Sequence, residues 1–349
     1  MKELLKLSRE EEERARRLHY EAFYVDTHCD TILSWMPPPE LPVIIRKTLK
    51  GYRRRGFTER SGEGHLDLPR MLEGGVDCQV FAVYVAPVYH SSPLRQALRM
   101  IDAFYSELGK TDRAVPCTSY SEVMNALRGG RVAALLSIEG GEPLEGDLGV
   151  LRMLYKLGVR ILTITHNRRN RLGNGCGEKG SKGGLSTFGV EVVREMNRLG
   201  MLVDVSHLNE PGFWDVIETS QDPVIASHSN ARALCDHVRN LTDEQIMALA
   251  ERGGVVGVTF VRSFLREDPE NASVNDVLDH IDHIVELVGV DHVGIGSDYD
   301  GIDQAPIGLE DVTKVLNITR GLVARGYSDG EIRKILGENF LRVFRRVLG

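Results

Sequence analysis

The sequence predicts an α/β fold of the (β/α)8 TIM-barrel class with additional terminal helices. Short apolar, β-branched runs alternate with longer amphipathic stretches, which is the pattern of βα units around a parallel sheet. No compositional break or Pro/Ser-rich linker divides the 349 residues, so we expect residues 1–349 to form a single barrel domain. A doubly wound open sheet is the alternative arrangement of the same units.

Eight runs have the length and composition of buried strands. They are residues 22–26, 78–85, 132–138, 159–165, 201–206, 223–227, 254–260 and 292–297. Most of the intervening stretches carry apolar residues at helical spacing. These predicted helices are residues 94–108, 121–128, 148–157, 188–199, 211–219, 243–252 and 274–288.

Further helices are predicted at both ends of the chain. Residues 1–21 form a highly charged N-terminal helix, and residues 309–349 supply amphipathic C-terminal helices over 309–325 and 328–347. Thr242 with Gln245, and Ser328 with Glu331, have the spacing of capping boxes that open two of the helices.

Composition excludes several classes of function. With 43 basic and 50 acidic side chains the net charge is -7, so the field of the protein repels nucleic acid and anionic membrane surfaces. The charged beginning does not resemble a secretory signal, and no window reaches the roughly 18 apolar residues of a membrane span. We therefore expect a cytoplasmic protein without a membrane partner. The five cysteines form no Cys-x-x-Cys pair, which predicts reduced thiols.

Polar residues gather at the carboxyl ends of six runs, where the active site of such a barrel is assembled. These residues are His28, Asp30, Glu139, His166, His207, His228 and Asp298. In an extended strand end His28 and Asp30 point the same way while Cys29 points away, so the pair can bind one ion. Imidazole and carboxylate ligands suit zinc or a similar divalent ion.

Convergence of these ionisable groups on an apolar rim costs desolvation unless a cation compensates, so the rim predicts a metal centre. The remaining histidines are expected on helices, loops or an amino end, away from the rim. They are His19, His65, His90, His237, His280, His283 and His292.

Several motifs together resemble the membrane (renal-type) dipeptidases, metallopeptidases with a binuclear zinc site in a (β/α)8 barrel. Ile138-Glu139-Gly140-Gly141, Gly158-Val159-Arg160 and Thr165-His166-Asn167 resemble the signature of that family. The resemblance continues through residues 28–30, 204–207, 227–229, 239–240 and 294–301. The chain is identified as a bacterial-type soluble member.

The resemblance implies two Zn²⁺ ions and a role for each rim residue. It implies that His28 and Asp30 hold one ion, His207 and His228 the other, and that Glu139 bridges both, with a bridging hydroxide as nucleophile. By the same resemblance His166 binds the substrate carbonyl oxygen as it becomes an oxyanion, Asp298 transfers the proton to the leaving amine, and Arg239 grips the terminal carboxylate. Glu142 and Asp300 are neighbouring carboxylates that leave the assignments of Glu139 and Asp298 open.

The predicted function is a zinc dipeptidase that hydrolyses free dipeptides, L,D-dipeptides included. Because family members form dimers, a homodimer is expected. One alternative is another binuclear amidohydrolase acting on cyclic amides, lactones or phosphotriesters, since the metal site alone fits all of these. A different class of alternative is a non-catalytic barrel that acts as a binding protein.

Overall fold

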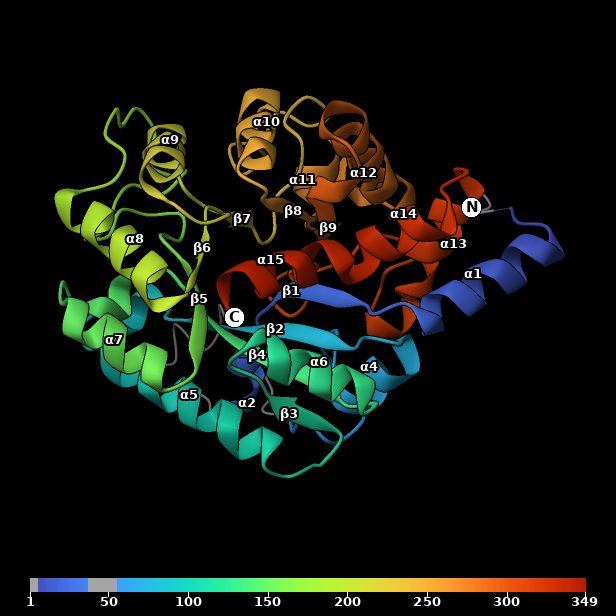
Figure 1. Cartoon of the computed structure of the whole chain (residues 1–349), viewed down its shortest axis with the longest axis horizontal. Coiled ribbons are helices and arrows are strands. Elements are labelled where there is room, and N and C mark those ends of the chain that lie inside the picture. Colours follow the sequence, from blue (N-terminus) through green and yellow to red (C-terminus); the bar gives the residue numbers. More distant parts are fainter. Residues whose placement is uncertain (1–5, 37–54) are drawn as a thin grey trace.

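Eight parallel strands close into a barrel, which confirms the predicted fold class (Figure 1). The computed structural model describes residues 6–36 and 55–349, so residues 1–5 of the predicted N-terminal helix lie outside the described part. Around the barrel the strand order is β2-β1-β9-β8-β7-β6-β5-β4, and β4 pairs back onto β2. The strands are β1 (Val25–Cys29), β2 (Cys78–Tyr84), β4 (Val132–Glu139), β5 (Val159–Thr163), β6 (Leu202–Asp204), β7 (Ile225–Ala226), β8 (Val255–Val258) and β9 (Val293–Ile295).

An additional strand, β3 (Ala114–Pro116), was not predicted from the sequence. It pairs with residues 132–134 at the start of β4, whereas β5 pairs with β4 only from Leu136 onward. The two strands therefore share one edge of β4. Three residues that end in proline carry no alternating pattern, so this strand left no signal in the sequence.

Helices surround the barrel on its outer side, as Figure 1 shows. Between strands they are α2 (Ile32–Trp35), α4 (Leu68–Gly74), α5 (Pro93–Leu108), α6 (Tyr120–Arg128), α7 (Leu148–Lys156), α8 (Thr187–Leu199), α9 (Glu210–Thr219), α10 (Asp243–Glu251), α11 (Arg262–Leu265) and α12 (Val274–Val288). The terminal helices are α1 (Arg9–Glu21), α13 (Leu316–Ala324), α14 (Asp329–Arg333) and α15 (Asn339–Val347). Both predicted capping boxes are present, at Thr242 and Ser328.

The C-terminal helices differ from the prediction in two places. The helix expected over 309–325 begins only at Leu316. The stretch expected as one helix over 328–347 contains a π-helical turn, Lys334–Glu338, between α14 and α15. At Gly337 in this turn a Cβ would lie 2.2 Å from the carbonyl oxygen of Phe23, so only glycine lets the turn approach the segment that leads into β1.

One end of the barrel is filled and the other carries the polar rim. Near the amino ends of the strands, Ala133 and Leu135 of β4 belong to a buried cluster that also contains Phe340 and Phe344 of α15. Because side chains alternate along a strand, Ser137 and Glu139 continue this inward face toward the carboxyl end. Helix α15 thus covers the amino-terminal end, and the inward face of β4 leads directly to the predicted site.

Candidate metal centre

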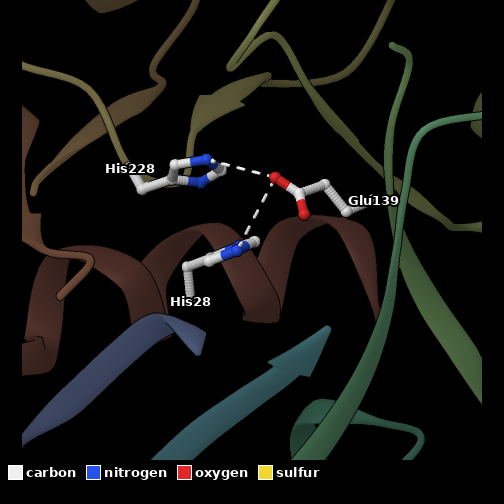
Figure 2. A group of neighbouring side chains, drawn as sticks. All are labelled: His28, Glu139 and His228. Atoms are coloured by element: carbon white, nitrogen blue, oxygen red, sulfur yellow. Dashed lines mark ion pairs between the residues drawn. The ribbon is translucent and has the colours of Figure 1, made fainter. Parts of the chain in front are cut away.

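Glu139, the last residue of β4, lies at the centre of a cluster of buried histidines. Its Oε1 is 2.8 Å from His207 Nε2, 3.5 Å from His228 Nε2 and 3.8 Å from His28 Nε2. Figure 2 shows the His28 and His228 rings directed at this one oxygen. All four side chains are buried. Residues that the sequence placed at four separate strand ends therefore meet within ligand distance of one another.

A β-bulge in β1 directs His28 and Asp30 toward this cluster. Asp26 pairs with Gln79 and Cys29 with Phe81, so β1 has one residue more than β2 between these pairs. An extra residue reverses the alternation of a strand. Thr27, before the bulge, and His28, after it, consequently both face the barrel interior, where Thr27 donates to the carbonyl of Ser227. The sequence predicted the shared direction of His28 and Asp30, and the bulge makes that direction inward.

His28, Asp30 and Asp298 surround a second point beside Glu139. His28 Nε2 is 3.7 Å from Asp30 Oδ2 and 3.9 Å from Asp298 Oδ1, which is too long for a hydrogen bond. His28 Nε2 and Asp30 Oδ1 are buried without a hydrogen-bond partner. Buried nitrogen and oxygen atoms that lack hydrogen-bond partners and lie at this spacing can bind a divalent cation between them.

Three triads with metal-ligand spacing result from this arrangement: His28, Glu139 and His228; Glu139, His166 and His207; and His28, Asp30 and Asp298. Glu139 belongs to two of them and His28 to two.

Burial sets the protonation of these groups in the metal-free chain. It raises the pKa of Glu139 well above its usual range and that of Asp298 to about 7. It lowers the pKa of His207 and of His228 well below the usual value for histidine. Neutral imidazoles keep a lone pair for a metal, and a cation would restore the charge of the carboxylates. The donor set therefore fits metal ions.

The cluster opens into a cavity of about 900 Å³ whose lining includes His166, Arg239 and Phe264. Burial lowers the pKa of His166 to about 4, so this imidazole is neutral. Arg239 is 5% exposed and donates through one terminal nitrogen to the carbonyl of His228, at 3.0 Å. Its Nε has no partner, and no carboxylate within the described residues forms an ion pair with it. A buried guanidinium in this state suits an anionic ligand.

Asp300, which the sequence left as an alternative to Asp298, is engaged elsewhere. It accepts hydrogen bonds from Thr31 Oγ1 (2.6 Å) and the His65 backbone N–H (2.7 Å), and it pairs with Arg55. Burial would raise the pKa of Asp300, but the hydrogen bond from His65 and the charge of Arg55 lower it to about 2. Asp298, in contrast, faces His28.

Glu142, the alternative to Glu139, lies outside the three triads, which were sought among the described residues. Its Oε2 accepts from Asn170 Nδ2, at 3.4 Å.

Two histidines expected away from the rim lie beside it, so this expectation was wrong for them. The His65 ring stacks on Tyr299 with centroids 5.3 Å apart, and its Nδ1 accepts from the backbone N–H of Asp300. His237 stacks on Phe264 with centroids 4.3 Å apart and accepts from the backbone N–H of Arg239. Both belong to loops, whose course has no sequence periodicity from which to predict it.

Other residues of the site were missed for a different reason. Tyr84, at the end of β2, places its ring 4.6 Å from that of His166. Asn167 Oδ1 lies 2.7 Å from His207 Nδ1. Asn167 directly follows a predicted rim residue, so its position was a signal, but its partner is 40 residues away.

Comparison with known proteins gives a match over nearly the whole chain. The family model for membrane dipeptidase, peptidase family M19, aligns with residues 12–348. The chain belongs to this family. Like other members of the M19 dipeptidases it is a metallopeptidase, which agrees with the metal-ligand spacing at the rim.

Individual relatives support the assignment to M19. The chain is 36% identical over 295 residues to dipeptidase tcpJ of Claviceps purpurea (strain 20.1), which covers 81% of this chain and 69% of that protein. The crystal structure of dipeptidase AC, an M19 metallopeptidase, superposes with a TM-score of 0.84 at 33% identity and covers 94% of this chain and 99% of that one.

A metallopeptidase from Rhodobacter sphaeroides, liganded with a phosphinate mimic of the dipeptide L-Ala-D-Ala, gives a TM-score of 0.83 at 33% identity. The match covers 93% of this chain and 99% of that one. Within the described residues of this M19 member, no helix combines the length and the apolar character that crossing a membrane requires.

Proposed function

We propose that this M19 dipeptidase uses two Zn²⁺ ions to hydrolyse free dipeptides, including those with a D-residue at the carboxyl end. The observation that carries the proposal is Glu139 Oε1, which lies within 3.8 Å of three imidazole nitrogens on three different strand ends. In the proposed site His28 and Asp30 would hold one ion and His207 and His228 the other, with Glu139 as a ligand available to both. Mixed imidazole and carboxylate ligands favour zinc.

The chain's own residues then have distinct tasks. Divalent ions bound there would lower the pKa of a bound water and polarise the substrate carbonyl. Asp298, which faces His28 at the rim, accepts a proton from water and donates it to the leaving amine. His166, neutral at physiological pH, donates an N–H to the carbonyl oxygen as negative charge develops on it.

Arg239 limits the length of the substrate in this proposal. A buried guanidinium without a carboxylate partner binds the terminal carboxylate when that group lies one residue beyond the scissile bond. This contact reaches the backbone end and not the adjacent side chain, so either configuration at the last residue is accepted. The Rhodobacter sphaeroides relative with its mimic of L-Ala-D-Ala supports this reading.

A substrate panel tests the proposal. Zinc-loaded protein is incubated with L-Ala-L-Ala, L-Ala-D-Ala, the amide of each, the N-acetyl forms and tripeptides extended at either end, and released amino acids are measured. We expect both free dipeptides to be cleaved. The amides should lose about 30-fold or more in kcat/KM, because a buried charge pair is worth about 2 kcal/mol or more.

Two results would contradict the proposal and favour its alternatives. Equal cleavage of the amides or tripeptides, or hydrolysis of lactones and cyclic amides instead, would favour a broader amidohydrolase. A protein that binds no metal and cleaves nothing in the panel would be a non-catalytic binding protein. The homodimer and the cytoplasmic location remain predictions from the family resemblance and from composition.

A further inference from the structure

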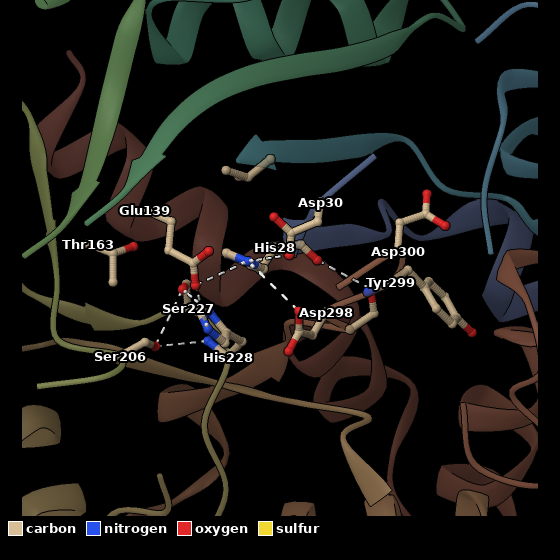
Figure 3. A network of polar contacts seen from close by, with 12 residues as sticks. His28, Asp30, Glu139, Thr163, Ser206, Ser227, His228, Asp298, Tyr299 and Asp300 are labelled. Atoms are coloured by element: carbon tan, nitrogen blue, oxygen red, sulfur yellow. Dashed lines mark hydrogen bonds and ion pairs between the residues drawn. The ribbon is translucent and has the colours of Figure 1, made fainter. Parts of the chain in front are cut away.

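A buried carboxylate behind His228 has no role in the proposed reaction. Asp204, at the end of β6, is 0% exposed. Its Oδ1 accepts from the backbone N–H groups of Ser206 (3.0 Å) and Ser227 (2.9 Å). Its Oδ2 accepts from Thr163 Oγ1 (2.5 Å) and Ser227 Oγ (2.6 Å). Four donors thus surround one carboxylate, and Figure 3 shows Ser206 and Ser227 beside the His228 ring.

The hydroxyl of Ser227 connects Asp204 to the imidazole. Ser227 Oγ is 2.6 Å from Asp204 Oδ2 and 2.7 Å from His228 Nδ1, and it has one hydrogen to donate. A carboxylate is the stronger acceptor, so the hydrogen is directed at Asp204. Ser227 Oγ must then accept from His228, which places the ring hydrogen on Nδ1 and the lone pair on Nε2.

The neighbouring imidazole has the same orientation. His207 Nδ1 lies 2.7 Å from Asn167 Oδ1, an oxygen that can only accept, so the His207 lone pair is also on Nε2. The two Nε2 atoms are 2.8 Å apart, and Glu139 Oε1 is 2.8 Å from His207 Nε2. Two imidazole nitrogens that meet at 2.8 Å with a lone pair on each and no hydrogen between them repel one another, and a bound cation removes this repulsion.

We propose that Asp204 and Ser227 are positioning residues that fix the tautomer of His228 before a metal ion binds. The inference rests on the proposed metal-dependent function, because it explains why His228 presents a ligand lone pair. Partners of this kind orient metal-bound imidazoles in general, and their loss weakens metal affinity by about 10–100-fold. Here the acceptor is reached through a serine hydroxyl and not by direct contact of carboxylate with ring.

The substitution Asp204→Asn gives a specific test because it keeps the shape of the side chain. The amide oxygen must still face the two backbone N–H donors, so the new NH2 group faces Ser227 Oγ. Ser227 then accepts from position 204 and turns its hydrogen to His228 Nδ1. The hydrogen of the ring moves to Nε2, where it blocks the ligand lone pair.

The first experiment determines this tautomer in metal-free protein labelled with ¹⁵N-histidine, by proton–nitrogen correlation spectra of the ring nitrogens. The His228 signals are assigned from their absence in a His228→Gln sample. We expect hydrogen on Nδ1 in the wild type and on Nε2 in Asp204→Asn. The matched control is Asp26→Asn, since Asp26 is also buried and accepts from the backbone of His28 and Ser297, without a path to the His228 ring. An unchanged tautomer in Asp204→Asn would overturn the proposal.

The second experiment measures zinc affinity by competition with a chromophoric chelator. Asp204→Asn and Ser227→Ala should each lower the affinity for one of the two zinc ions by about 10–100-fold and leave the affinity for the other unchanged. Ser227→Ala keeps the inference testable if Asp204→Asn does not fold. Ser229→Ala is the control for Ser227→Ala, because the Ser229 hydroxyl contacts Ser206 and not the His228 ring. Equal affinities in Ser227→Ala and Ser229→Ala would contradict the inference.

The outcomes separate this inference from the proposed function. Suppose that the wild type binds two zinc ions and cleaves dipeptides, and that both variants keep the His228 tautomer and the zinc affinities of the wild type. The proposed function would then be supported and the positioning role contradicted. Suppose instead that the wild type cleaves no dipeptide, but Asp204→Asn inverts the tautomer and lowers the metal affinity. The positioning role would then be supported and the proposed function contradicted.

Discussion

His166 occupies the boundary between the metal centre and the substrate cavity, and two roles are compatible with its position. It forms a metal-ligand triad with Glu139 and His207, and it also lines the cavity with Arg239. Its ring lies 4.4 Å from that of His207, centroid to centroid. Because burial keeps the imidazole neutral, it can offer either a lone pair to a metal or an N–H to an oxyanion.

The proposed oxyanion role makes a prediction that a ligand role does not. His166→Ala should lower kcat by about 10²–10³, the typical cost of one oxyanion donor, and should keep both zinc ions. Elemental analysis and steady-state kinetics on the same sample measure both effects, with Glu139→Ala as the variant expected to release metal. Loss of an ion from His166→Ala would make it a ligand, and a rise in KM alone would make it a ground-state binding residue.

At the scale of elements, the barrel is held together unequally around its circumference. Strands β2 and β4 pair over seven residues, whereas β6 and β7 share a single pair and β1 and β9 another. Side chains supply the missing connections where the ladders are short. Thr27 Oγ1 lies 2.7 Å from the carbonyl oxygen of Ser227 and 3.0 Å from that of Ile295, so its one hydrogen is shared between two strand ends. The side-chain amide of Asn230 bonds both backbone groups of Thr259.

Replacement of Thr27 by valine should therefore destabilise the barrel although the two side chains have similar shapes. The hydroxyl is lost, and the buried carbonyl of Ser227 is left without this donor, which costs about 1–3 kcal/mol. Urea unfolding of the metal-free protein measures the change in the free energy of unfolding. Thr187→Val, at the exposed first position of α8, is the control and should stay within about 0.5 kcal/mol of wild type. Equal stability of the two variants would show that the strand ends do not depend on Thr27.

The same short ladders explain which elements the sequence predicted well. Each of the eight predicted runs overlaps an observed strand, since a fully buried strand leaves an apolar run whatever its partners. Boundaries were less accurate: the first run was expected to end at Asp26, but β1 continues to Cys29 through its bulge. A bulge depends on the register with the neighbouring strand, which has no local signature.

The predictability of the site divides along similar lines. Rim residues such as Glu139 and His228 were predicted because the carboxyl ends of parallel strands meet at one edge. Their supporting contacts were not, because Asp204 reaches Ser227 across 23 residues and Asp300 reaches Arg55 across 245. Contacts at such separations depend on the closed barrel and become visible only in three dimensions.

For the whole molecule, the proposed metal centre acts as a connection between distant parts of the barrel. Its residues come from the ends of β1, β4, β6, β7 and β9, whereas α15 closes the opposite end. Without a cation, this end of the barrel contains carboxylates and imidazoles whose charged forms are disfavoured by burial. Binding of ions therefore joins strand ends that have few backbone hydrogen bonds between them.

Removal of metal should consequently lower the stability of the entire protein. A ligand that binds only the folded state stabilises it by about 4 kcal/mol at 1,000 times its Kd, which for a chain of this size corresponds to a shift in Tm of about 5 °C. Calorimetry of zinc-loaded and chelator-treated protein measures the shift, and re-addition of zinc should reverse it. Glu139→Ala, which lacks the central carboxylate, should unfold at the same temperature with and without zinc. If wild type also showed no difference, the cluster at the rim would not bind metal in the folded state, and the rim would have to tolerate its buried charges through protonation alone.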